Sequence, residues 1–136
     1  MSISNELKCF YGHLYMDKFI SSKGFTMVRF DEEGFDACAA TLKDSNGCKI
    51  TVSFNIHDEE PDECELVIQL HNRCSIEQLK SLAGKIAEDK GQRIDLYDEP
   101  DVISLVTYYD LTQKDEPIDM MKVLLDGINK NIFFLV

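Results

Sequence analysis

Apolar residues recur every three or four positions from Asn5 to Ser22, which is the period of an α-helix with one buried face. The pattern then changes to short runs of alternating apolar and polar residues, separated by turns rich in Asp, Glu and Gly. The alternation is cleanest from Lys49 to His57, where apolar side chains fall on one face and polar side chains on the other. Four such runs predict β-strands at 25–30, 35–42, 49–57 and 64–71.

The helical period returns after Ser75, which forms a capping box with Gln78 and opens an apolar stripe that ends near Gly91. Two further runs, 93–97 and 102–111, predict a pair of strands joined across an acidic turn. The second of these runs is apolar on both faces, which is typical of a strand in the interior of a sheet or at an interface. A last helix is predicted from Pro117 onward, with Asp115 as its cap.

The order of these elements predicts an α+β fold in one domain spanning residues 1–136. We expect an antiparallel β-sheet of about six strands flanked by three helices, in the order α-β-β-β-β-α-β-β-α. A chain of 136 residues is long enough to bury a core without disulfides or metals.

The charge balance is strongly acidic, with 25 Asp and Glu against 14 Lys and Arg, a net charge of −11. Such a field repels nucleic-acid phosphates and anionic lipid, so we expect neither direct nucleic-acid binding nor membrane binding. It attracts a basic protein surface, although acidity for solubility alone is equally compatible with the composition. The charge therefore directs attention to a protein partner.

The five cysteines are odd in number, and the N-terminal residues lack the basic and apolar regions of a secretion signal. No apolar run approaches the roughly 20 residues that span a bilayer. We therefore expect a cytoplasmic location.

The sequence does not favour a catalytic or metal-binding site. His57, Cys64, His71 and Cys74 lie close in sequence, but strand alternation puts Cys64 and His71 on opposite faces, and no short-range chelate spacing is present. No nucleophile elbow, phosphate-binding glycine loop or calcium-loop spacing occurs either. We expect no enzymatic activity, no metal and no cofactor.

The remaining hypothesis is recognition of a partner through the protein surface, because aromatic residues are enriched at interface hot spots. Two sets of residues are candidates for binding a partner protein. The apolar set is Tyr108, Tyr109, Phe133, Phe134 and Leu135; the acidic set is Asp58, Glu59, Glu60, Asp62, Glu63, Asp98, Glu99 and Asp101. The apolar C-terminal tail, 132–136, requires a cover, either in the core or at an interface.

The layout resembles that of the class I type III secretion chaperones and the wider superfamily of YbjN-like proteins. The segments that carry the resemblance are Phe30–Gly34, Ile50–Phe54 and Glu65–Leu70, each at the expected place in the element order. The resemblance implies a homodimer that holds an extended segment of a partner protein on apolar patches, without ATP. The chain departs from the pattern in having four strand runs before the middle helix.

Two functional hypotheses follow from these observations. The first is a non-enzymatic protein-binding module, chaperone-like or an adaptor, which holds a segment of a partner by adding it to a sheet edge or laying it over apolar surface. The second is an acidic inhibitor, such as an immunity or phage counter-defence protein, whose carboxylates block a basic nucleic-acid-binding site on a target protein. Both make the partner another protein, and the expected homodimer is what the family resemblance implies.

Overall fold

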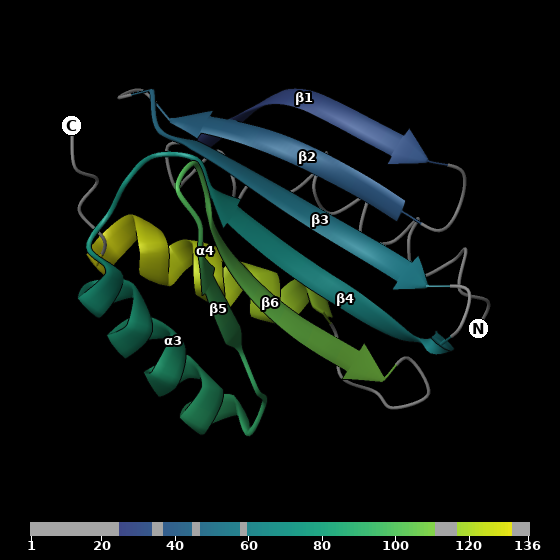
Figure 1. Cartoon of the computed structure of the whole chain (residues 1–136). Helices are drawn as coiled ribbons and strands as arrows, with labels where there is room; N and C mark the ends of the chain where they lie inside the picture. Colours follow the sequence, from purple (N-terminus) through teal and green to yellow (C-terminus); the bar gives the residue numbers. More distant parts are fainter. Residues whose placement is uncertain (1–24, 34–36, 45–46, 58–59, 111–116, 132–136) are drawn as a thin grey trace.

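The computed structural model describes residues 25–33, 37–44, 47–57, 60–110 and 117–131 (Figure 1). The strands are β1 (Phe25–Glu33), β2 (Ala37–Asp44), β3 (Lys49–His57), β4 (Glu60–Leu70), β5 (Asp95–Asp98) and β6 (Ile103–Asp110), and the helices are α3 (Ile76–Lys90) and α4 (Pro117–Asn131). The predicted helix at 5–22 and the tail residues Phe133, Phe134 and Leu135 lie outside the described residues.

All neighbouring strands pair antiparallel in one sheet, in the order β1-β2-β3-β4-β6-β5. The first four strands follow one another as a meander, because short polar turns connect them. After α3 the chain returns as a hairpin whose second strand, β6, lies beside β4, which leaves β5 at the edge of the sheet. The apolar run 102–111 is thus an interior strand with a partner on each side, as its pattern predicts.

The first strands differ in length from the prediction. β4 begins at Glu60, where His57 pairs with Glu60 after an irregularity next to Ile56. The predicted turn 58–62 therefore shrinks to a two-residue connection, and Glu60 and Asp62 belong to a strand. The backbone hydrogen bonds of a hairpin can extend into a run of acidic residues. The low strand propensity of those residues does not predict this.

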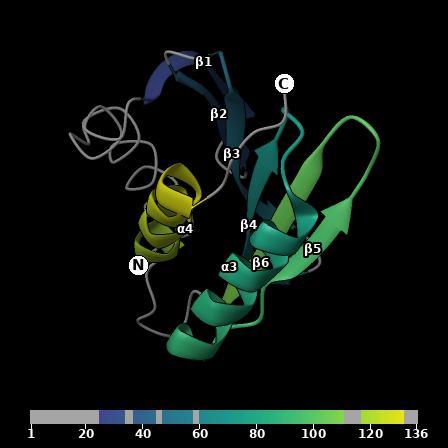
Figure 2. The same cartoon turned by 90° about the vertical axis from the view of Figure 1, so that its left-hand side faces the viewer.

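The helices require a correction, because the described part of the chain contains two and not the predicted three. Both helices lie on the same face of the sheet (Figure 2), so they do not flank it. The physical reason is the alternation in the strands: β3 and β4 carry aliphatic side chains on one face only, and a helix needs such a face to pack against.

The core lies between the sheet and these two helices. It is built from the apolar residues of β2, β3, β4 and β6 together with one stripe from each helix, and its fully buried side chains include Phe54, Leu66, Ile68, Leu79, Met121 and Leu124. The two helices approach closely, since a Cβ atom on Gly127 of α4 would meet Leu82 Cδ1 of α3 at 2.7 Å. Glycine at this position lets the helices pack.

The ends of α3 agree with the sequence signals. Ser75 Oγ accepts a hydrogen bond from the Gln78 amide at 3.3 Å, which satisfies a free N–H of the first turn. Gly91 ends the helix with φ of +62°, and its N–H bonds to carbonyls of the last turn. The Ser75 cap and the glycine stop are thereby confirmed.

Candidate protein-binding face

The sheet face that points away from α3 and α4 is named the open face here, because none of the described helices covers it (Figure 1). Its residues alternate along each strand with those of the core, and the register of the ladders brings them side by side. Most are polar and partly exposed. The described side chains on this face include Ala39, Thr41, Lys43, Lys49, Thr51, Ser53, Asn55, Glu63, Glu65, Val67, Gln69, Asp95, Tyr97, Ser104, Val106 and Tyr108.

Two exposed tyrosines break this polar pattern. The exposed fraction is 50% for Tyr97 on β5 and 42% for Tyr108 on β6. Val106 lies on the same face of β6, opposite Asp95, and is buried, with an exposed fraction of 8%. We define the tyrosine patch as Glu65, Asp95, Tyr97, Val106 and Tyr108. It offers aromatic surface with an apolar centre, which is the composition found at interface hot spots.

The patch is also charged. Arg93 Nε donates to Asp95 Oδ1 at 2.8 Å, and the arginine side chain is 85% exposed whereas that of Asp95 is 26% exposed. The hydrogen bond and charge of Asp95 raise the pKa of Arg93, and the two tyrosines lie near enough to contribute in the same direction. A guanidinium group is therefore already seated beside these carboxylates and phenols.

Tyr108 remains a neutral phenol beside this charge. Its pKa is raised, first by loss of hydration and then by its hydrogen bond with Glu65 and by the charges of Glu65, Tyr97 and Asp95. A neutral hydroxyl donates to the Glu65 carboxylate, and the register places these two residues directly opposite each other. The pair joins β4 to β6 across the open face.

Hydrogen bonds from two side chains hold residues 92–93, which precede β5, against β6. Gln92 Nε2 donates to Thr107 Oγ1 at 3.1 Å and also to the carbonyl of Tyr108. Thr107 Oγ1 in turn donates to the Arg93 carbonyl at 2.8 Å. These bonds fasten residues 92–93 to β6, so β5 and its tyrosine are positioned against a firm support.

Of the predicted apolar set, Tyr108 lies in this patch. Tyr109 pairs with the buried Cys64, so its register position belongs to the covered side, and its side chain lies outside the description. Tyr97 was not predicted, although Ile94 and Leu96 alternate with Asp95 and Tyr97 and indicate which residues face outward. A strand of four residues places only two side chains on each face, so its alternation is a weak signal.

The predicted acidic set separates into two places. Asp98, Glu99 and Asp101 are exposed at the β5–β6 turn, next to Tyr97. Glu63 is partly buried and pairs with Asp110, at the other end of β6. Asp58 and Glu59 lie outside the described residues, as do the side chains of Glu60 and Asp62. At about 3.4 Å per residue, the length of β6 separates the two ends by roughly 24 Å, so the described carboxylates form no single cluster.

One histidine–hydroxyl pair also lies on the open face. His71 Nε2 is 2.7 Å from Thr51 Oγ1, which is 3.3 Å from Thr41 Oγ1. Burial and then the charge of Lys49 lower the pKa of His71, so the ring is neutral near pH 7. Thr51 sits in an interior strand whose backbone is paired on both sides, with Thr41 and Gln69, so it has no amide left to stabilise an oxyanion. The pair is a structural link between strands.

The soft ligands do not converge either. Within the described ranges no three His, Cys, Asp or Glu side chains are placed to hold a metal ion. Cys64 is buried in the core, whereas His71 is exposed on the open face. Cys48, Cys64 and Cys74 are buried, and burial followed by the charge of Asp98 raises the pKa of Cys74, which keeps that thiol protonated.

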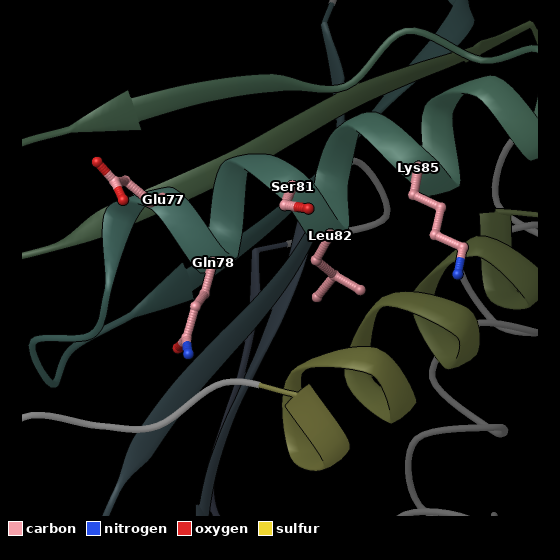
Figure 3. A pocket seen from close by; sticks show the side chains of 5 residues that line it. All are labelled: Glu77, Gln78, Ser81, Leu82 and Lys85. Atoms are coloured by element: carbon pink, nitrogen blue, oxygen red, sulfur yellow. The ribbon is translucent and has the colours of Figure 1, made fainter.

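A hollow of about 470 Å³ opens on α3, on the helix side of the molecule. It is lined by Glu77, Gln78, Ser81, Leu82 and Lys85, and Figure 3 shows Leu82 and Lys85 pointing toward α4. Most of this lining is exposed to solvent. The tyrosine patch is thus the stronger candidate for recognition.

No family model, curated protein or solved structure matches the chain. Neither of the described helices is long and apolar enough to cross a membrane. The open face is therefore the candidate site.

Proposed function

We propose that this protein is a non-enzymatic protein-binding module, chaperone-like or an adaptor, which holds a segment of a partner protein on the tyrosine patch. The observation that carries the proposal is the exposure of Tyr97 and Tyr108, at 50% and 42%, on neighbouring strands of the open face. Tyrosines give a large contact area with little side-chain entropy to lose, and their hydroxyls remain usable at a wet interface.

A basic partner segment suits this patch best. Glu65 and Asp95 lie beside the two phenols, and the whole chain carries a net charge of −11. Lysine and arginine side chains bind over aromatic faces and pair with carboxylates, as Arg93 does with Asp95. We place the interaction in a reducing cytoplasm, since the odd number of cysteines in the chain favours that compartment.

The test is quantitative capture of partners from a lysate of the source cells. Wild-type protein is compared with a Tyr97→Ser, Tyr108→Ser double variant and with Val28→Ser. Val28 is the matched control, since it is 55% exposed but lies on β1, at the opposite edge of the sheet.

We expect the proteins captured by wild type and by Val28→Ser to fall about tenfold or more with the double variant, because aromatic hot spots dominate binding. Circular dichroism and thermal unfolding establish that each variant is folded. Equal recovery by the double variant, or equal loss with Val28→Ser, would contradict the proposal.

The second candidate function is the acidic inhibitor, and the observation that favours it is the exposed turn carrying Asp98, Glu99 and Asp101. In that case these carboxylates occupy a basic nucleic-acid-binding site on the captured target. Neutralising all three should then restore nucleic-acid binding by the target, and affinity should fall steeply with salt. Binding through the tyrosines loses little affinity over the same range of salt.

A further inference from the structure

The strand next to the tyrosine patch ends the sheet. β5 pairs with β6, and within the described chain no other strand lies against it (Figure 1). An edge strand presents N–H and C=O groups that a further strand can use.

The geometry of the β5–β6 hairpin shows which residues of β5 present these backbone groups. The Glu99 amide donates to the Val102 carbonyl at 3.1 Å, which makes this the hydrogen-bonded pair at the turn. Hydrogen-bonded and non-bonded pairs alternate along an antiparallel ladder, so Tyr97 with Ser104 and Asp95 with Val106 are bonded pairs. The carbonyl of Tyr108, two residues further along β6, faces the same way, since Gln92 bonds to it. The backbone groups of Leu96 and Asp98 therefore point outward.

The side chains at this edge differ between the two faces of the sheet. Leu96 is partly buried and packs against the core, whereas Asp95 and Tyr97 lie on the open face. A residue added opposite Leu96 would extend the core, and its two neighbours would lie beside Asp95 and Tyr97. An apolar residue between two basic residues matches both faces.

A second copy of the chain fits this edge poorly. β5 reads Asp-Leu-Tyr-Asp and is followed by Glu99 and Asp101. Pairing two such strands would bring carboxylates of like charge together, which destabilises a ladder. A basic strand would instead place one basic residue beside the carboxylate of Asp95 and the other beside the ring of Tyr97.

We infer that the segment bound by this protein is an extended basic–apolar–basic stretch that adds to β5 as a further antiparallel strand, bonding to the backbone of Leu96 and Asp98. This inference rests on the proposed function and names the chemistry of its partner. Main-chain hydrogen bonds supply part of the affinity, and the side chains next to Asp95, Leu96 and Tyr97 supply the selectivity.

The first experiment uses a blocked peptide, Ser-Thr-Arg-Val-Arg-Thr-Ser, titrated into the full-length protein by calorimetry. An N-methyl group on valine removes the amide that bonds to Leu96, and should lower the affinity about tenfold or more. The matched control carries the N-methyl group on the following arginine, whose amide points to solvent, and should bind within about twofold of the parent. The composition control, Ser-Thr-Val-Arg-Arg-Thr-Ser, should bind more weakly than the parent.

The second experiment changes the protein. Asp98→Pro removes the outward N–H and suits an edge strand, whereas Asp98→Asn keeps the N–H and removes the charge. We expect proline to abolish peptide binding and asparagine to weaken it by a few-fold. Thermal unfolding checks the fold of both.

The outcomes are distinguishable. Equal effects of the two N-methyl groups, with Asp98→Pro binding like wild type, would overturn strand addition and leave the tyrosine patch as the binding site. A parent peptide that binds no better than its composition control would overturn the partner chemistry. A wild-type dimer that Asp98→Pro dissociates would make a second copy the occupant. The proposed function itself fails if the Tyr97→Ser, Tyr108→Ser variant captures partners like wild type, or if Val28→Ser loses them equally.

Discussion

The two faces of the sheet are made by the same strands and perform different tasks. On β3, Val52 and Phe54 are fully buried under the helices, while Thr51, Ser53 and Asn55 alternate with them on the open face. The covered face supplies hydrophobic stabilisation, whereas the side chains of the open face contribute little apolar surface to the core. Since each residue belongs to only one face, stability and binding can be altered separately.

The strongest test of this division compares two neighbours on β3. Phe54→Ala leaves a cavity in the core and should lower the free energy of unfolding by about 3–5 kcal/mol. Ser53→Ala, one residue away on the open face, should change it by no more than about 0.5 kcal/mol. Urea unfolding followed by circular dichroism measures both, and equal losses would mean that the open face is buried in the native protein.

The next test concerns the helices that form the cover. Gly84 on α3 has open space where a Cβ atom would lie, so Gly84→Ala should raise the free energy of unfolding by about 0.5–1 kcal/mol. Gly127→Ala has the same helix preference in its favour, but its Cβ would meet Leu82 Cδ1 at 2.7 Å, so the gain should be smaller or reversed. Thermal unfolding of both variants measures the difference, and an equal gain would show that α3 and α4 do not pack at this point.

The smallest effect is expected from the polar network of the open face. The pKa of His71 is lowered in the folded chain, so the unfolded chain binds the proton more tightly. The stabilisation is present above the unfolded value of about 6.5 and is lost as the pH falls through and below it. Urea midpoints at about pH 7.5 and about pH 5.5 should therefore differ less for His71→Gln than for wild type. An unchanged pH dependence in that variant would remove His71 from the account.

Much of the local structure could be predicted from the chain alone. Alternation marks the strand from Lys49 to His57, and Ser75 and Gly91 mark the ends of α3, because each signal depends only on nearby residues. The strand order could not be predicted, since the place of β6 beside β4 depends on pairing across the intervening helix. The three-helix count was wrong for the described chain, which contains two helices, and the predicted helix at 5–22 lies outside the described residues.

The candidate site shows the same limit. Tyr108 was predicted as an interface residue, but Asp95 and Tyr97 lie on another strand, opposite Val106 and Ser104, and share its face only through the register. The acidic residues were grouped by their nearness to turns, and the sheet places those turns at opposite ends of β6. Spatial neighbours of this kind follow from long-range pairing, which local patterns do not contain.

The sheet order has a consequence for the order of folding. The meander β1 to β4 joins strands through short turns, whereas pairing Leu70 with Ile103 closes a loop of roughly 30 residues that includes α3. Contacts between distant residues form more slowly than local ones, so the meander can assemble first and β6 dock later. β5 attaches through β6, which makes the edge beside the tyrosines the last part of the sheet to form. A newly synthesised chain would then expose a competent binding edge only once the rest of its sheet is complete.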